Sequence, residues 1–260
     1  MAAMTNLLEA RGLTRKFGGV VALDNLELVV TPNEILGLIG PNGSGKTTFF
    51  NVVTGIYSAH HGSVILNGAD ITRASSRAVY HFGIARTFQR SRLSLPLSVF
   101  DNIMIGNHKR LNQGLWFNLI RRADFKAEFK ENYHVARKLV EVFEPKLAMR
   151  MFEPVAGLPM IDRRRIEICR ALISQPKLLL LDEPSAGMTH EETKELMDDI
   201  LQVRDLHRNL TIVIVEHEMG VIERITDRCV VLNFGRKIAE GPYRQVAADR
   251  HVQEAYLGVA

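Results

Sequence analysis

The sequence of 260 residues contains only two cysteines and no long run of apolar residues. Cys169 and Cys229 each stand among apolar neighbours without metal-ligand spacing, which is typical of reduced core cysteines in a cytosolic protein. No apolar run approaches the ~20 residues that a membrane-spanning helix needs. Residues 1–10 lack the basic and apolar regions of a secretory signal, so we expect none.

The sequence also lacks a strong charge of either sign. Its 33 Lys and Arg residues against 29 Asp and Glu give a formal net charge of +4, which indicates ordinary solubility. A hydrophobic fraction of 46% and a charged fraction of 24% are typical of a soluble globular protein. The length suits one large domain, or a core with a smaller lobe.

The most specific motif is a glycine-rich run that fits the phosphate-binding P-loop pattern. It consists of Gly40, Pro41, Asn42, Gly43, Ser44, Gly45, Lys46, Thr47 and Thr48. The apolar residues 34–39 predict a buried strand before the run, and residues 46–53 predict the start of a helix after it. Because strand, loop and helix are in register, we favour a P-loop over a chance glycine-rich turn.

The chemistry of this run explains its composition. Glycines allow backbone conformations that a β-carbon opposes, so that successive amides can point at a phosphate chain. The N-terminus of the following helix adds partial positive charge at the same place. Lys46 supplies a full charge to the β- and γ-phosphates, and the Thr47 hydroxyl is able to ligate Mg²⁺.

Two adjacent carboxylates follow a second apolar run. Four leucines at residues 178–181 predict a buried strand that ends in Asp182 and Glu183, which is a Walker B arrangement. We expect Asp182 to hold Mg²⁺ directly or through water. Glu183 is expected to point the other way, because alternate residues of an extended chain do so, and to orient the attacking water.

Three further residues are candidates for the same site. Phe17 lies 23 residues before Gly40 and either stacks on a purine ring or belongs to the core, and its spacing leaves both interpretations open. Gln89 ends a predicted strand, where a glutamine is able to reach a metal or its water ligands. His217 follows another predicted strand and suits either a contact to the γ-phosphate or a structural role.

The remaining pattern predicts an α/β protein. Strands are expected at residues 7–17, 23–30, 63–66, 84–88, 178–181, 211–215, 228–233 and 236–240, and helices at 99–107, 123–143, 163–174 and 190–206. We therefore predict a single domain over residues 1–260. Its core covers about 1–90 and 175–260, and a helical lobe covers about 99–174.

The chain resembles one family, the ATP-binding cassette (ABC) ATPases, in the order of its motifs: the P-loop, Gln89, Asp182-Glu183 and His217. The resemblance covers nearly the whole chain. Residues 13–22 resemble the family's adenine-stacking loop, which implies base contacts from Phe17 and Val21. Residues 86–89 resemble its Q-loop, which implies that Gln89 is a ligand of Mg²⁺. Residues 182–187 resemble the family's Walker B motif followed directly by its D-loop.

Within this family, residues 215–219, the ending 255–258 and the insertion around Trp116 resemble ATPase subunits of branched-chain amino acid uptake transporters. The resemblance implies a P-loop ABC-cassette fold, with a mixed central sheet, an antiparallel β subdomain and a helical lobe. It implies hydrolysis of ATP with Mg²⁺, with Glu183, His217 and Lys46 as the catalytic residues. It also implies two cassettes packed head to tail beneath two integral membrane permease subunits, with a substrate-binding protein as an indirect partner, and a peripheral location on the cytoplasmic face of the inner plasma membrane.

The aromatic insertion gives an expectation of its own. Residues 115–120, which include Trp116, are followed by two arginines and are expected to lie against a membrane subunit or the lipid headgroup layer. Packing within the helical lobe is the alternative.

The sequence departs from the family at the signature motif, which in the family reads Leu-Ser-Gly-Gly-Gln, or a Gly-Gln variant, at the start of a helix. The aligned residues here are Leu158, Pro159, Met160, Ile161 and Asp162. The Ser and both glycines are missing, and Ile161 brings a β-branched side chain where the backbone must approach phosphate closely. Asp162 is predicted to cap the helix that follows.

The signature of one cassette completes the nucleotide site of the other, so a homodimer would carry this defect twice. We therefore predict an obligate heterodimer with an intact-signature partner and one strongly active site. The alternative is that residues 163–165, all arginines, still stabilise the γ-phosphate together with the helix N-terminus. The D-loop departs as well, because Thr189 stands where Asp or Asn is expected.

Two other functions compete with a transport motor. One is a regulatory module that binds ATP and barely hydrolyses it, which the lost signature favours and Glu183 and His217 disfavour. The other is an ABC protein that acts on ribosomes or DNA, which a single P-loop in 260 residues disfavours, so we expect no nucleic-acid partner. The transported solute is not encoded in this chain, since that specificity belongs to other subunits. Branched-chain amino acids are what the resemblance implies, and amides, urea and aromatic acids stay open.

Overall fold

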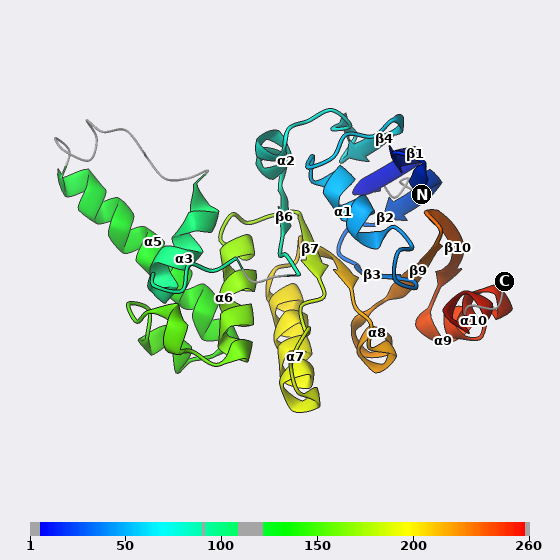
Figure 1. Cartoon of the computed structure of the whole chain (residues 1–260). Helices are drawn as coiled ribbons and strands as arrows, with labels where there is room; N and C mark the ends of the chain where they lie inside the picture. Colours follow the sequence, from blue (N-terminus) through cyan, green and yellow to red (C-terminus); the bar gives the residue numbers. More distant parts are fainter. Residues whose placement is uncertain (1–5, 90–91, 109–121, 258–260) are drawn as a thin grey trace. The chain divides into compact units, whose positions relative to one another are not determined.

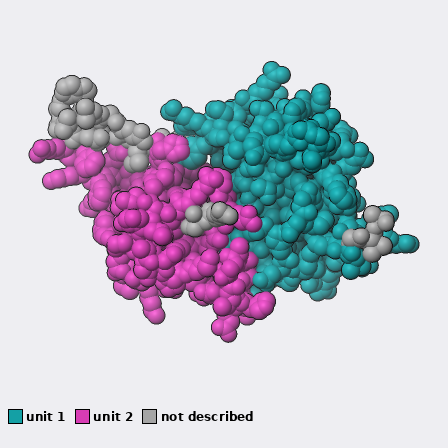
Figure 2. Space-filling model, in the orientation of Figure 1, with its two compact units in different colours: residues 1–86, 177–184, 204–260 teal, residues 87–176, 185–203 magenta. Residues whose placement is uncertain are grey.

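The computed structural model describes residues 6–89, 92–108 and 122–257 of the chain. It divides into two compact units, coloured separately in Figure 2. Unit 1 comprises Met1–Arg86, Lys177–Pro184 and Arg204–Ala260, and unit 2 comprises Thr87–Pro176 and Ser185–Val203. The helical lobe expected at about 99–174 falls within unit 2, which also contains Ser185–Val203.

Unit 1 contains an antiparallel sheet with the strand order β2-β1-β4-β5. Its strands are β1 (Leu8–Phe17), β2 (Val20–Val30), β4 (His61–Leu66) and β5 (Ala69–Asp70). Along β2 the buried residues Leu26, Leu28 and Val30 alternate with residues that keep some exposure, as expected for a sheet with one face on the core. The predicted antiparallel subdomain is therefore present.

The second sheet of unit 1 positions the candidate site. Its order is β10-β9-β3-β8-β7-β6, and all of its strand pairs are parallel except the one between β10 and β9 (Figure 1). The strands are β3 (Ile35–Ile39), β6 (Ile84–Arg86), β7 (Leu178–Asp182), β8 (Thr211–Val215), β9 (Arg228–Asn233) and β10 (Arg236–Gly241). Every residue of β3, β7 and β8 is buried, which is why these strands read as continuous apolar runs.

Five helices belong to unit 1 within the described ranges, and only the first was predicted. They are α1 (Lys46–Val53), α2 (Ser76–Phe82), α8 (Met219–Ile225), α9 (Tyr243–Ala247) and α10 (Arg250–Leu257). The four missed helices have eight residues or fewer, too short for a helical repeat of apolar residues to stand out. The α2 helix does carry local signals, since the Ser75 hydroxyl caps its start and Gly83 ends it at a φ of +102°.

Unit 2 is helical in the parts that the structure describes. It contains α3 (Val99–Met104), η1 (Ile105–Asn107), α5 (Arg122–Phe143), η2 (Leu147–Met149), η3 (Val155–Gly157), α6 (Met160–Leu172) and most of α7 (His190–Leu206). Helices α3, α5 and α6 pack against one another. The expectation for residues 115–120, with Trp116, lies outside the described residues.

The start of α6 corrects one prediction. The helix begins at Met160 with Pro159 as its N-cap residue, and Asp162 lies inside the first turn. Proline suits this position because it has no amide hydrogen to leave unsatisfied. The Asp162 carboxylate instead accepts a hydrogen bond from Arg165 at 3.2 Å, so its charge is paired within the helix.

A buried ion pair joins the beginnings of β3 and β9. Arg228 donates from Nε and Nη2 to the two carboxylate oxygens of Glu34, each at 2.9 Å, and the Thr31 amide donates to the same carboxylate at 2.6 Å. Arg228 also pairs with Glu240 on β10. One arginine therefore holds the start of β9 against both neighbouring strands.

We expect Glu34→Ala to lower the free energy of unfolding by about 2 kcal/mol, because it leaves most of the Arg228 guanidinium buried without its bidentate partner. Urea denaturation followed by circular dichroism measures the change. Glu9→Ala is the matched control, since it removes a carboxylate that pairs with the exposed Arg11 and should leave the free energy of unfolding nearly unchanged. Equal losses in the two variants would contradict the role given to Glu34.

Candidate nucleotide-binding site

The P-loop connects β3 to α1 in a conformation that only glycine tolerates at two points. Gly40 has a φ of +145°, and a β-carbon there would lie 2.1 Å from the Leu232 carbonyl oxygen. Gly45, at a φ of +110°, would meet the Ala22 carbonyl oxygen at 2.6 Å. The loop therefore packs closely against β9 and β2, as the glycine-rich motif predicts.

The N-terminus of α1 offers several backbone amides to a ligand. The first helical hydrogen bond runs from the Phe49 amide to the Gly45 carbonyl at 2.8 Å. The amides of Lys46, Thr47 and Thr48 precede that bond, so helix geometry provides them with no acceptor. Together with the helix dipole they form an anion-binding position at the end of the loop.

Lys46 is buried and held by the loop itself. Its side-chain Nζ donates to the carbonyl oxygens of Gly40 at 2.7 Å and Pro41 at 3.1 Å. Burial lowers the pKa of Lys46, and the charges of Glu183 and Asp182 oppose this shift. The ammonium group is thus positioned before any ligand arrives, with both predicted carboxylates within electrostatic reach.

The carboxylates emerge from β7 in a way that corrects our geometric expectation. The strand ends at Asp182, and Glu183 adopts a left-handed conformation with a φ of +49° instead of continuing the extended chain. The Glu183 amide donates to the carbonyl oxygen of Val215, the last residue of β8, at 2.9 Å. The two side chains therefore diverge because of this turn and not because of strand alternation.

His217 and Glu183 lie in direct contact. The Nε2 atom of His217 is 2.7 Å from Oε1 of Glu183, and the His217 side chain is 45% exposed while that of Glu183 is 16% exposed. The sequence left open a contact from His217 to a γ-phosphate or a structural role, and the partner of His217 within the chain is this carboxylate. The pair joins the ends of β7 and β8 at the edge of the sheet where the P-loop begins.

Asp182 has a partner that the sequence analysis missed. Its Oδ2 atom accepts a hydrogen bond from Arg86 at 2.6 Å, and the side chains of Arg86 and Asp182 are only 5% and 3% exposed. Arg86 ends β6, the neighbour of β7 in the sheet. The sequence did contain a signal for Arg86, namely its position at the end of a short predicted strand, but we considered only Gln89 there as a site residue.

The candidate base-binding residues lie at the tip of the β1–β2 hairpin. Phe17 and Val21 are 38% and 39% exposed, so Phe17 is not a core residue. The Phe17 ring packs edge-on against Tyr57 with centroids 5.2 Å apart, and the Arg15 guanidinium lies 4.7 Å from the Phe17 ring centroid. The aromatic ring is therefore accessible and held in place by two neighbours.

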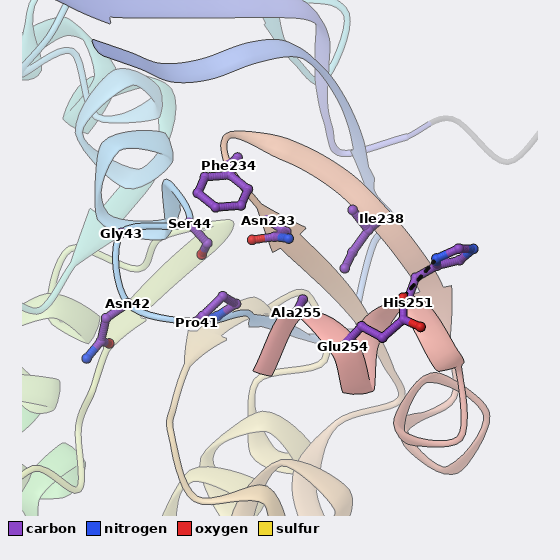
Figure 3. Close-up of a pocket in the computed structure, with 10 residues that line it drawn as sticks. All are labelled: Pro41, Asn42, Gly43, Ser44, Asn233, Phe234, Ile238, His251, Glu254 and Ala255. Atoms are coloured by element: carbon purple, nitrogen blue, oxygen red, sulfur yellow. Dashed lines mark ion pairs between the residues drawn. The ribbon is translucent and has the colours of Figure 1, made fainter. Parts of the chain in front are cut away.

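A cavity of about 510 Å³ borders the P-loop (Figure 3). It is lined by Pro41, Asn42, Gly43, Ser44, Asn233, Phe234, Ile238, His251, Glu254 and Ala255, which come from the P-loop, the β9–β10 hairpin and α10. On α10, the partial burial of Tyr256 raises its pKa to about 12. The α10 helix therefore lies beside the P-loop, since residues of both line the same cavity.

The remaining candidates lie in unit 2. Gln89 is exposed, and its carbonyl oxygen accepts a hydrogen bond from Arg164 at 3.3 Å. The three arginines at the start of α6 all have partners within the unit. Arg163 donates to the Ala156 carbonyl, Arg164 pairs with Glu167, and Arg165 pairs with Asp162, Glu195 and Asp199. Each guanidinium is thus engaged inside its own unit.

The described residues contain no group of three or more His, Cys, Asp or Glu side chains able to hold a metal ion by themselves. This agrees with the chemistry of Mg²⁺, which is usually bound by one or two protein oxygens together with water and substrate phosphates. A hydroxyl at Thr47 and a carboxylate at Asp182 fit such a role. Across the described ranges, we find no helix with the length and apolarity that a membrane span requires.

The fold and this site together define a P-loop nucleotide-binding domain. Residues 23–186 match the family described as "ABC transporter", and residues 236–260 match "Branched-chain amino acid ATP-binding cassette transporter". The chain therefore belongs to the ABC transporter family and is one of its ATPases. These findings confirm the predicted fold class and the predicted resemblance.

Curated relatives cover almost the entire chain. The chain is 37% identical over 254 residues to the high-affinity branched-chain amino acid transport ATP-binding protein LivG of Escherichia coli K12, covering 98% of each protein. It is 34% identical over 254 residues, again 98% of each, to the high-affinity branched-chain amino acid transport ATP-binding protein BraF of Pseudomonas aeruginosa.

Solved structures give the same family. A nucleotide-free ATP-binding cassette from an ABC transporter superposes with a TM-score of 0.82 at 29% identity, over 96% of this chain and 98% of that one. The ADP conformation of an ATP-binding cassette from an ABC transporter gives a TM-score of 0.83 at 29% identity, over 97% and 99%.

We expect Lys46→Ala to weaken the binding of Mg-ATP by about 2–3 kcal/mol, because it removes a buried charge placed by two backbone carbonyls. Isothermal titration calorimetry measures the affinity. The exposed Lys177, at the opposite end of β7, provides the control Lys177→Ala, which should bind as the wild type does. Unchanged affinity in Lys46→Ala would contradict the site.

Proposed function

We propose that this chain is the motor subunit of an importer for branched-chain amino acids, which binds and hydrolyses ATP to drive uptake through separate permease subunits. The observation that carries the proposal is the arrangement at one sheet edge of Lys46, Asp182 and the hydrogen-bonded pair Glu183–His217. The names of the relatives and the match at residues 236–260 support the solute class.

Each residue of the site has a role in this proposal. The P-loop amides and Lys46 bind the phosphates, while Phe17 and Val21 contact the base. Thr47, Asp182 and Gln89 hold Mg²⁺, which supplies charge neutralisation at the β- and γ-phosphates. Glu183 orients and polarises the attacking water, and His217 keeps the Glu183 carboxylate in position through the contact at 2.7 Å.

A water-orienting carboxylate is what separates a motor from a binding module. Glu183 accepts His217 as a partner and lies close enough to Lys46 to affect its pKa. A protein that only senses ATP has no need of this pair. We therefore favour the motor over the regulatory module.

The partners follow from the family. We propose a second ABC ATPase subunit, two integral membrane permeases and, indirectly, a substrate-binding protein, with this chain at the cytoplasmic face of the inner plasma membrane. No part of the proposal involves nucleic acid.

The altered signature gives the proposed assembly its asymmetry. Ile161 is buried and Asp162 is paired with Arg165, so the start of α6 offers no serine hydroxyl and no glycine amides to a partner's nucleotide. The arginines that follow are engaged within unit 2, as described above. We therefore propose a heterodimer in which this chain's P-loop site faces an intact signature, while its own signature completes a weak site.

We expect Glu183→Gln to bind ATP normally but to lose ATP hydrolysis by roughly 10²- to 10⁴-fold, because the amide cannot act as a base. Phosphate release from the assembled transporter and uptake of labelled leucine by cells should fall together. Glu223→Gln, an exposed carboxylate of α8 that pairs with Arg244, is the control and should keep full activity. Wild-type turnover in Glu183→Gln would sink the role of Glu183, and normal turnover without leucine uptake by the wild type would sink the solute class.

The asymmetry predicts unequal effects of matched mutations. Glu183→Gln in this chain should nearly abolish turnover of the assembled transporter, because it removes the base of the one complete site. The equivalent change in the partner cassette should be mild. Steady-state ATPase assays on the two singly mutated heterodimers decide the matter, and equal losses would rule the asymmetry out.

A further inference from the structure

We propose that Arg86 is a positioning residue that sets the placement of Thr47 and Asp182, two of the three predicted Mg²⁺ ligands, relative to each other. The inference rests on the proposed nucleotide site and adds to it a residue that acts through the predicted metal ligands. Its basis is one buried guanidinium that hydrogen-bonds in two directions, to β7 and to α1.

The first contact fixes the Asp182 carboxylate. Nη2 of Arg86 donates to Oδ2 of Asp182 at 2.6 Å, and both side chains are almost fully buried. A charge-assisted hydrogen bond between two buried groups restricts the rotation of the Asp182 side chain, so the carboxylate keeps a preferred orientation before a metal arrives. Partners of this kind behind a metal ligand are a general device for orienting it.

The second contact fixes the guanidinium to the helix that carries Thr47. Nη1 of Arg86 donates to Oδ1 of Asn51 at 2.7 Å. Asn51 lies four residues after Thr47 on α1, so the two side chains occupy the same face of the helix, one turn apart. The bridge Asn51–Arg86–Asp182 therefore ties that face of α1 to the end of β7.

Packing restricts the bridge further. The guanidinium carbon of Arg86 lies 5.2 Å from the centroid of the Phe50 ring, and Phe50 is fully buried on α1. The planar fork of arginine is able to serve two partners at once while lying against an aromatic ring. A lysine keeps the charge but has no fork, so it cannot hold both oxygens in the same geometry.

The test measures how strongly Mg²⁺ improves ATP binding, with hydrolysis removed. All variants carry Glu183→Gln, and calorimetry gives the ATP dissociation constant once in EDTA and once in saturating Mg²⁺. In Arg86→Lys and Arg86→Met, the gain in ATP affinity that Mg²⁺ provides should be smaller by roughly 10- to 100-fold. The ATP dissociation constant measured in EDTA should change by less than about 2-fold. Asn51→Ala should act in the same direction with a smaller effect, because it releases only one end of the bridge.

Arg228→Lys is the matched control. Arg228 also holds a buried carboxylate with two hydrogen bonds, but at the opposite end of the parallel strands, at the start of β9. This variant should lose stability in thermal melting and keep the wild-type response to Mg²⁺. The comparison separates a loss of positioning from a general loss of packing.

Three outcomes would overturn the inference. A wild-type response to Mg²⁺ in both Arg86 variants, or an equal loss of affinity with and without Mg²⁺, leaves Arg86 with a structural role only. If the parent protein binds no ATP, the proposed function fails, and this inference fails with it. The first two results leave the proposed function intact, so the two failures are distinguishable.

Discussion

Three buried strands, β3, β8 and β7, lie side by side and run in the same direction, so their carboxyl ends meet at one edge of the central sheet. The P-loop leaves β3 at this edge, Asp182 ends β7, and His217 follows β8 two residues after its last strand residue. The P-loop is separated from the other two segments by more than a hundred residues along the chain, and parallel hydrogen bonding brings all three together. Without that register, neither the phosphate-binding amides nor the carboxylates would have a common target.

Charge balance is the second condition of the site. Lys46 and Arg86 are both buried, as is Asp182, while Glu183 keeps only a small exposed fraction. Each of these charges has a partner, because a buried charge without one would be costly. The two cations have different partners. Lys46 donates hydrogen bonds to backbone carbonyls, whereas Arg86 forms an ion pair with a carboxylate. A phosphate chain can therefore recruit Lys46 without breaking an ion pair.

Much of this site was predictable because its signals are local. The glycines of the P-loop, the leucines before Asp182 and the strand before His217 each lie within a few residues of the group they position. Arg86 was missed because its partners, Asn51 and Asp182, are 35 and 96 residues away, and no short pattern records such a pair. The turn at Glu183 was missed for a similar reason, since its amide is held by Val215 of the neighbouring strand.

The altered signature shows the opposite case, in which a local signal misled. Asp162 has the side chain of a helix cap, yet α6 begins two residues earlier and Asp162 turns to Arg165. That arginine also reaches Asp199 on α7, so a tertiary contact decided the role of the aspartate. The intrinsic preference of aspartate for the helix N-cap was overridden here by its ion pair with Arg165, because tertiary contacts often outweigh propensity.

The cavity lined by both P-loop residues and residues of α10 places this helix beside the P-loop. In thermodynamic terms, the docking of α10 against the P-loop and the binding of nucleotide by that loop are two equilibria that can be coupled. If nucleotide binding stabilises the docked position of α10, then by linkage the docked helix favours nucleotide binding by the same free energy. Hydrogen exchange at the C-terminal helix thus becomes a remote readout of nucleotide occupancy, some two hundred residues away along the chain from the loop that binds it.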